Sequence, residues 1–237
     1  LMFINNLTDT VIANPQQGFF YHDVLPNLRL FFPLITMGLI SRELNNGTIK
    51  LLYSSPVRIR EIILGKFLAM VGFSLILMLI LSFTLMGLSA SLARPDYGHI
   101  FAAIVGLFLL LCTYGAIGLF VSSFTSYQIV AAIATIAVLL ILSKIGGLWQ
   151  DVESLRNITF YLNIQGRSSQ LIAGLLNVRD VVYFLILTGT FIGFTIIRLK
   201  SNTESISLFK KIGRYALVLA AAVILGFVST LPQVNGY

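Results

Sequence analysis

Long apolar stretches separated by short polar segments run through the whole chain. Six of them have the length and composition of membrane-spanning helices, and they cover residues 24–41, 63–92, 100–121, 129–148, 181–197 and 215–231. Their apolar residues are continuous rather than alternating, which favours helices over β-strands. The pattern therefore predicts an all-α fold, a polytopic bundle of transmembrane helices. The first stretch holds Arg29 near one end of the span, where its guanidinium can snorkel to the headgroups.

The composition supports this class of protein. Hydrophobic residues make up 57% of the chain and charged residues only 11%, whereas soluble domains carry about a quarter charged residues. The net charge is +7, and in a membrane protein such an excess of Lys and Arg reports orientation and contact with lipid headgroups. We therefore expect membrane lipid, and no nucleic acid, as a partner. The single cysteine, Cys112, lies in an apolar stretch and is predicted to be a packing residue.

The positions of Lys and Arg predict which side of the membrane each loop faces. Basic residues follow the first predicted span between Arg42 and Lys66, and the fifth between Arg198 and Arg214. Alternating crossings put both groups on one side, which is the cytoplasm by the positive-inside rule. The segment 149–180 and both ends of the sequence then lie outside. An external start is unusual for such a protein, so we expect that a cytoplasmic start and one earlier helix precede this sequence, unless Met2 is the genuine start.

Nothing in the sequence predicts catalysis, a metal site or a cofactor in this chain. It contains no His-Glu-x-x-His motif, no Gly-x-Ser-x-Gly motif and no paired Cys or His with metal spacing. Gly65 and Lys66 resemble the end of a phosphate-binding loop, but Arg60 replaces the first glycine and Phe67 the required Ser or Thr. The second to sixth spans also lack interior Asp, Glu and His, which argues against a carrier coupled to ions or protons. A passive channel stays open as an alternative.

Residues 42–66 form a charged segment between the first two spans. Asn45, Asn46 and Gly47 are a turn signal, and Thr48 is placed to cap a short helix. Three apolar residues fall on one face of that helix: Ile49, Leu52 and Tyr53. Pro56 suits the first turn of the next helix, which enters the membrane. The pattern predicts an amphipathic helix on the cytoplasmic surface, tethered at both ends to membrane helices. A basic loop held by anionic lipid fits the same residues equally well.

Three stretches of the chain carry motifs that also occur together elsewhere. The first is SRELNNGTIKLLYSSPVRIREIILGKFLA at 41–69. Its acidic residue, Gly-Thr, leucine-rich turn, Ser-Pro and Gly-Lys, in this order, resemble the signature region of the ABC-2 type transporter permease family. The second is GLFVSSFTSYQIVAA at 118–132, similar to the family's tight cytoplasmic turn, and the third is LIAGLLNVRDVVYFL at 171–185, similar to its external segment. Together they place residues from about 25 to 200 in this family, and the resemblance implies a type V exporter-like permease fold. Within the family, the stretches resemble the gliding-motility-associated permease group.

The resemblance implies an ATP-driven exporter powered by another chain. A separate cassette ATPase in two copies would hold the ATP and Mg²⁺, and a second permease copy or homologous half would complete the transporter. Seven residues would lie in or beside the coupling helix that meets the ATPase: Glu43, Gly47, Thr48, Leu51, Leu52, Ser55 and Pro56. Glu43 would orient this helix by charge and Gly47 would permit the turn. Arg58 and Arg60 would pair with acidic residues of the ATPase or, as an equal alternative, with lipid headgroups.

The chain divides into two predicted ranges. Residues 1–200 are the permease core without its first helix, and residues 201–237 are a basic linker and an extra helix, which resembles the membrane anchor of an extracytoplasmic auxiliary protein. In the external segment, four apolar residues predict an amphipathic or re-entrant helix: Leu171, Ile172, Leu175 and Leu176. Such a helix closes the outer end of the pathway in related exporters, or is interfacial only.

The expected location is the bacterial cytoplasmic (inner) membrane, which the chain would cross several times. The expected function is that of a permease subunit, which couples hydrolysis by the partner ATPase to movement of a substrate. The alternative is a non-transporting membrane anchor, or a force-transmitting subunit of an envelope or gliding motility complex.

Overall fold

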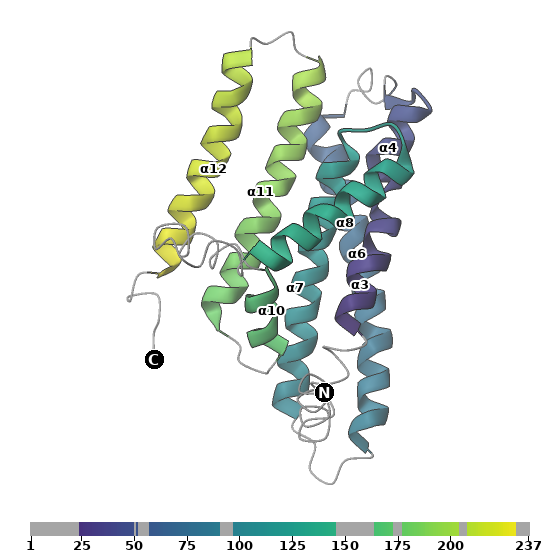
Figure 1. The fold of residues 1–237 in the computed structure, drawn as a ribbon, viewed down its shortest axis with the longest axis vertical. Coiled ribbons are helices and arrows are strands. Elements are labelled where there is room, and N and C mark those ends of the chain that lie inside the picture. Colours follow the sequence, from purple (N-terminus) through teal and green to yellow (C-terminus); the bar gives the residue numbers. More distant parts are fainter. Residues whose placement is uncertain are drawn as a thin grey trace.

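The described part of the chain is helical. The computed structural model describes residues 24–49, 51, 57–90, 97–145, 164–172, 177–203 and 208–230, and these residues contain no strand (Figure 1). Their helices have the following bounds: α3 Leu25–Thr36, α4 Gly38–Asn45, α6 Ile59–Ala90, α7 Tyr97–Ser122, α8 Gln128–Lys144, α10 Ile164–Ile172, α11 Val178–Thr203 and α12 Leu208–Thr230. The predicted all-α fold is confirmed.

The long helices coincide with the predicted membrane spans. Within the described residues, three segments are long and apolar enough to cross a membrane: Ile59–Phe83 in α6, Phe101–Ser122 in α7 and Val178–Ser201 in α11. Gln128–Lys144 and Ile212–Leu225 are shorter apolar segments in α8 and α12. Together with α3 and α4 they account for the six stretches that the sequence pattern predicts. The protein is therefore a multi-pass membrane bundle.

One end of the bundle carries most of the basic residues. The end of α4, the start of α6, the turn between α7 and α8 and the connection between α11 and α12 all lie at this end, which is uppermost in Figure 1. Arg42, Lys66, Arg198 and Lys200 are at or near these helix ends. We call it the basic end. The positive-inside rule predicts that it faces the cytoplasm.

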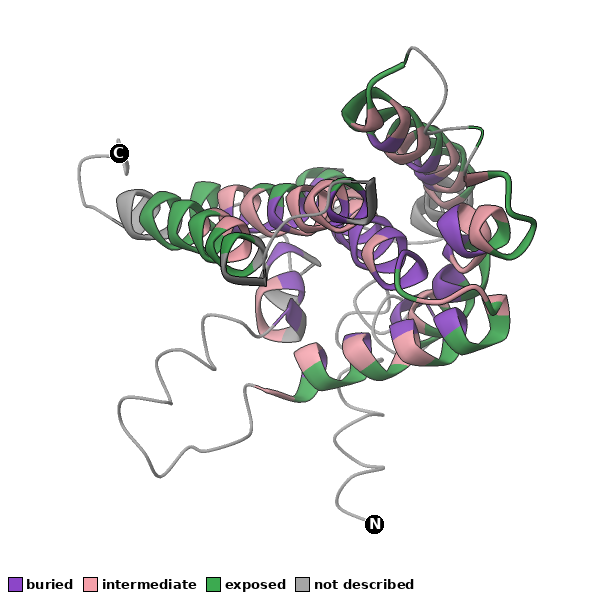
Figure 2. Ribbon diagram, turned by 90° about the horizontal axis from the view of Figure 1, so that it is seen from above, coloured by how far each residue is buried: buried purple, intermediate pink, exposed green. Residues whose placement is uncertain are grey.

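The centre of the bundle is α7. About two thirds of its apolar span is buried, 67%, compared with 22% for α6 and 33% for α11. The main core forms where α7 meets its neighbours, and its fully or nearly fully buried side chains include Phe32, Met70, Leu107, Leu111, Tyr114, Leu171 and Phe184. Figure 2 shows buried residues turned toward the middle of the bundle and exposed residues on the outer faces. In a membrane those outer faces meet lipid tails.

The first span is broken at Met37, between α3 and α4. Pro33 lies inside α3 and has no N–H to donate to the helical ladder. The N–H groups of Ile40 and Ser41, in the first turn of α4, both donate to the Ser122 hydroxyl of α7, at 3.0 and 2.9 Å. That hydroxyl in turn donates to the carbonyl oxygen of Met37, at 2.9 Å. Ser122 is fully buried. Its hydroxyl therefore provides hydrogen-bond partners for the backbone groups at the break, and these bonds hold the break against α7.

Two glycines of α7 allow neighbouring helices to lie very close. A Cβ at Gly118 would overlap Thr36 of α3, and a Cβ at Gly106 would lie 2.6 Å from the Cβ of Leu171 in α10. Real Cβ atoms do not approach other atoms this closely, because the repulsion rises steeply. Because these two glycines have no side chain, α3 and α10 can pack directly against the backbone of α7.

The short helix α10 lies toward the opposite end from the basic end and is fixed by a buried ion pair. The guanidinium Nη1 of Arg167 donates to Oδ1 of Asp180 at 2.7 Å. Cζ of the same guanidinium lies 4.7 Å from the ring centroid of Tyr183. Asp180, in the first turn of α11, is 2% exposed. The predicted outer helix therefore corresponds in part to α10, whose last turn contains Leu171, while Leu175 and Leu176 lie outside the described residues.

The last helix, α12, packs on the outer side of α11. The rings of Phe194 in α11 and Tyr215 in α12 have their centroids 5.4 Å apart. Much of the rest of α12 is exposed, including Leu217 and Val223, as expected for a helix that faces lipid. The division of the chain at residue 200 stays a prediction.

Candidate functional site

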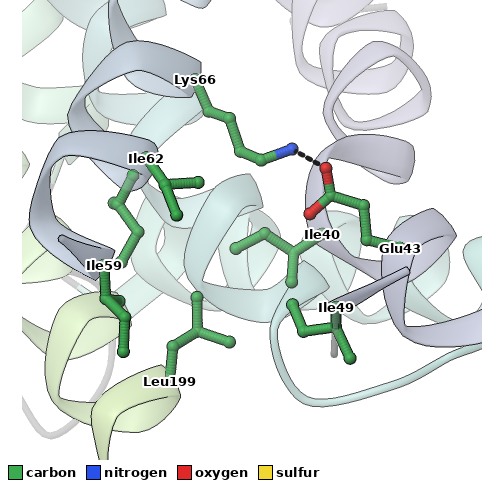
Figure 3. Close-up of a pocket in the computed structure, with 8 residues that line it drawn as sticks. Ile40, Glu43, Ile49, Ile59, Ile62, Lys66 and Leu199 are labelled. Carbon is green, nitrogen blue, oxygen red and sulfur yellow. Dashed lines mark hydrogen bonds and ion pairs between the residues drawn. The ribbon is translucent and has the colours of Figure 1, made fainter. Parts of the chain in front are cut away.

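An ion pair joins α4 to α6 at the basic end. Nζ of Lys66 lies 2.5 Å from Oε1 of Glu43 (Figure 3). The same ammonium group donates to the carbonyl oxygen of Leu39, at 2.7 Å. The Lys66 and Glu43 side chains are 22% and 26% exposed, and Oε2 of Glu43 is buried with no hydrogen-bond partner within the described residues. Because both charges are largely removed from water, separating them costs more than breaking a surface pair.

A small apolar cluster surrounds this ion pair. We call it the basic-end cluster, and its buried members are Ile40 of α4, Ile63 of α6, Leu119 of α7 and Leu199 of α11, none of which is more than 4% exposed. Ile49 and Ile59 pack against it and line a small pocket together with Glu43 and Lys66 (Figure 3). The cluster therefore joins four membrane helices to both flanks of the charged segment.

The backbone turns sharply where α4 ends. Gly47 has φ +70°, a left-handed conformation that glycine adopts without a steric penalty. The hydroxyl of Thr48 donates to the carbonyl oxygen of Glu43 at 3.4 Å. The N–H of Leu51 donates to the carbonyl oxygen of Thr48 at 3.0 Å. Gly47 thus reverses the chain, and Thr48 ties the following residues back to the end of α4.

The outer side of the charged segment is exposed. Leu51 is 70% exposed and Val57 45%, and Arg58 and Arg60 are exposed as well. The backbone N–H of Arg58 donates to the Glu61 carboxylate at 3.3 Å, just before α6 begins at Ile59. The segment therefore presents an apolar and basic surface at the end of the bundle. Three predicted site residues lie outside the described residues: Leu52, Ser55 and Pro56.

A comparison with protein families decides what kind of membrane protein carries this site. Residues 28–229, from within α3 into α12, match the family described as ABC-2 family transporter protein. The chain belongs to the ABC-2 transporter permease family. It matches no curated protein and no solved structure at a significant level.

Membership of this family makes the chain the permease subunit of an ABC transporter. Such a permease is the membrane component, is not itself the catalytic part, and associates with an ATPase subunit. Within the described ranges of this permease, no three His, Cys, Asp or Glu side chains gather in an arrangement that could hold a metal ion.

The permease brings some of the predicted site residues together and separates others. Glu43, Gly47 and Thr48 meet at one turn, whereas Leu51, Arg58 and Arg60 point outward from the bundle. Their roles toward an ATPase stay predictions.

Lys66 belongs to this site, but the sequence did not predict it as a site residue. Its signal was present, because Lys66 is the one charged residue in the predicted span 63–92, and a charge within a span needs a partner. Its acid, Glu43, is 23 residues away, so their pairing depends on how α4 lies against α6.

Proposed function

We propose that this permease is the transmembrane subunit of an ATP-driven exporter, and that residues 46–60 form the surface through which a cassette ATPase moves it. One observation carries the proposal. The Glu43–Lys66 ion pair and the basic-end cluster fasten both flanks of this segment to the membrane helices, while its described residues Leu51, Val57 and Arg58 are exposed. Two ATPase copies, which hold the ATP and Mg²⁺, would act on two permease copies or on two homologous halves.

Movement of this segment would reach four helices through direct contacts. Leu51 and Val57 offer apolar area to a docked protein, and Arg58 and Arg60 offer charge for acidic residues. A displacement of the Gly47 turn and the start of α6 moves Glu43 and Lys66 together, because their ion pair is partly desolvated. The basic-end cluster then passes the displacement to α7 and α11, since packed side chains move as a unit rather than deform.

The cellular setting belongs to the same proposal. The basic end would face the cytoplasm of a bacterial cell, with the permease in its cytoplasmic membrane, as the distribution of Lys and Arg supports. The resemblance to gliding-motility-associated permeases supports a role in a multi-component envelope system. In that system α12 would anchor an extracytoplasmic auxiliary protein.

The coupling step can be tested in nanodiscs that contain the full-length permease and its ATPase. Spin labels on Phe83→Cys in α6 and Ile133→Cys in α8, in a Cys112→Ser background, report the distance between two exposed positions. We expect that ATP changes this distance in the parent protein. In Glu43→Gln and Lys66→Met variants the ATPase should stay bound and hydrolyse ATP while the distance change is lost.

Two further variants control this experiment. Exchanging the charges, with Glu43→Lys and Lys66→Glu in one protein, should restore part of the distance change. Lys144→Met removes an exposed charge at the far end of α8 and should leave the movement intact. If the Glu43→Gln and Lys66→Met variants respond to ATP like the parent protein, the ion pair does not couple the two subunits.

A second assay separates an exporter from the alternative function. Inside-out vesicles that contain the permease and its ATPase are incubated with cell extract, and accumulated molecules are identified by mass spectrometry. An exporter accumulates its substrate only with ATP. If the chain is a membrane anchor or a force-transmitting subunit, the ATPase hydrolyses ATP without any ATP-dependent accumulation.

A further inference from the structure

A cluster of aromatic rings joins α7, α11 and α12 near the basic end. Neighbouring rings have their centroids 4.9–6.2 Å apart. The members of this aromatic cluster are Phe120 of α7, Phe124 of the turn after it, Phe191 and Phe194 of α11, and Tyr215 of α12. The contact of Phe194 with Tyr215 also sets the register of α11 against α12, which run in opposite directions (Figure 1). Arg198, one turn after Phe194, is therefore level with the first turn of α12.

Arg198 and Ser201 place two unpaired hydrogen-bonding groups beside this cluster. Cζ of Arg198 is 4.8 Å from the centroid of the Phe124 ring, and its Nε is buried without a hydrogen-bond partner in the described part of the chain. Ser201, one turn further on the same face of α11, is 6% exposed, and its hydroxyl has no partner in that part either. Buried polar groups are nearly always hydrogen-bonded, so two such groups one turn apart indicate that something else binds here.

The corner between α11 and α12, formed by Arg198, Ser201 and Lys210, is positively charged. Among the described residues of α11 the one acid is Asp180, at the opposite end of the helix, and those of α12 include none. Lys200 near the end of α11 and Lys210 in the first turn of α12 are both exposed. Lys210 also lies where the helix dipole is positive and where an acidic residue would be favourable. The fixed charges at this corner therefore attract an anion.

Arg198 lies at the depth where lipid headgroups meet acyl chains. The apolar span of α11 ends at Ser201, so at about 1.5 Å per residue the Arg198 backbone is about 5 Å inside that end. From this level an apolar surface leads along α12 away from the basic end. Leu219 and Val223, on the same face of α12 as Tyr215, are 50% and 69% exposed. A soluble anion makes no use of this surface, whereas the acyl chain of a lipid can lie along it.

We propose that the corner between α11 and α12 binds an anionic phospholipid, with its phosphate on Arg198 and Ser201 and an acyl chain along α12. The planar guanidinium offers paired N–H donors that match phosphate oxygens, and the Ser201 hydroxyl supplies a further donor. The contact with the Phe124 ring holds the guanidinium at the corner. Lys200 and Lys210 favour a headgroup with net negative charge over a zwitterionic one. This binding depends neither on the ATPase nor on export.

Binding is tested with the full-length permease in detergent by native mass spectrometry, without ATPase or nucleotide. The probes are dioleoyl phosphatidylglycerol and dioleoyl phosphatidylcholine, which have the same tails and differ in net charge. Wild-type protein should bind phosphatidylglycerol more tightly. Arg198→Gln should weaken that binding about tenfold and remove the preference, as expected for the loss of a charge-assisted hydrogen bond. Ser201→Ala should weaken it about threefold, as expected for a neutral hydrogen bond.

Two further variants control for charge and for position. Arg198→Lys keeps the charge but loses the paired N–H donors, so it should retain part of the preference. Arg42→Gln removes an exposed arginine at the same end of the bundle, on α4, and should leave the binding unchanged. Equal binding of phosphatidylglycerol by wild type and Arg198→Gln would overturn the proposal. Displacement of phosphatidylglycerol by inorganic phosphate would also overturn it, because the site would then serve a soluble anion. Because no ATPase is present, failure of the coupling proposal leaves these results unaffected.

Thermal unfolding in nanodiscs of either lipid distinguishes a lipid site from a structural role. Phosphatidylglycerol should raise the unfolding temperature of wild type above its value in phosphatidylcholine, because a bound ligand stabilises the folded state. Arg198→Gln should reduce this difference, and Arg42→Gln should preserve it. If Arg198 instead pairs with a carboxylate of the protein, Arg198→Gln leaves that charge buried and lowers the unfolding temperature equally in both lipids. That result would assign Arg198 to structure alone and overturn the proposal.

Discussion

Ser122→Ala should destabilise the permease far more than the same change one residue later. The Ser122 hydroxyl accepts from the N–H groups of Ile40 and Ser41 and donates to the carbonyl oxygen of Met37. That carbonyl keeps a second donor, the Ser41 hydroxyl, but the two N–H groups would be left buried and without their acceptor. A buried orphan group costs about 1–3 kcal/mol in soluble proteins, and hydrogen bonds in membrane proteins average about 0.6 kcal/mol. The expected loss for two groups is therefore about 2–4 kcal/mol.

Ser123→Ala is a matched control for this change. Ser123 follows directly after α7 and is also buried, but its hydroxyl donates to the carbonyl oxygen of Phe120, three residues earlier in the chain. Its loss should cost about 0.5 kcal/mol. Unfolding in detergent can be followed with a thiol-reactive dye, because the chain has a single cysteine, Cys112, which is partly buried. If the two variants unfold within about 0.5 kcal/mol of each other, Ser122 does not hold the break against α7.

Three other predictions concern packing, the outer ion pair and the turn. Gly118→Ala should lower the free energy of unfolding by about 1–3 kcal/mol because the new Cβ overlaps Thr36, whereas Gly189→Ala, which meets no atom within 4 Å, should be neutral in the same unfolding assay. Asp180→Asn should weaken the ion pair with Arg167 and so speed hydrogen exchange in α10; unchanged exchange there, relative to the exposed control Arg179→Gln, would contradict this role. Gly47→Ala should lower the free energy of unfolding by about 1 kcal/mol, because Gly47 has a left-handed backbone conformation, and it should reduce the amount of ATPase that copurifies. Gly65→Ala has open space around it and should leave both the stability and the copurified ATPase unchanged.

The helices were predictable because they depend on local composition. Each span is a continuous apolar stretch, and the turn between α7 and α8 is a short polar interruption, so a window along the chain finds both. Gly47 was predictable for the same reason, since a glycine after two asparagines is a turn signal.

The contacts that hold the helices together were not predictable in this way. Ser122 binds backbone groups more than 80 residues away, and Lys66 binds a carboxylate 23 residues away. No repeating pattern in the sequence indicates these contacts, because they depend on which helices pack against each other.

Among the described residues, the two apolar clusters of the bundle share one, and this residue is a candidate pivot between them. Leu39 packs against both the main core and the basic-end cluster, and its carbonyl oxygen accepts from Lys66. It stands next to Gly38, directly after the break in the first span. We therefore expect the basic end to rearrange as a unit about Leu39 while the main core stays packed. The amides of α4 should then exchange with solvent before those in the middle of α7.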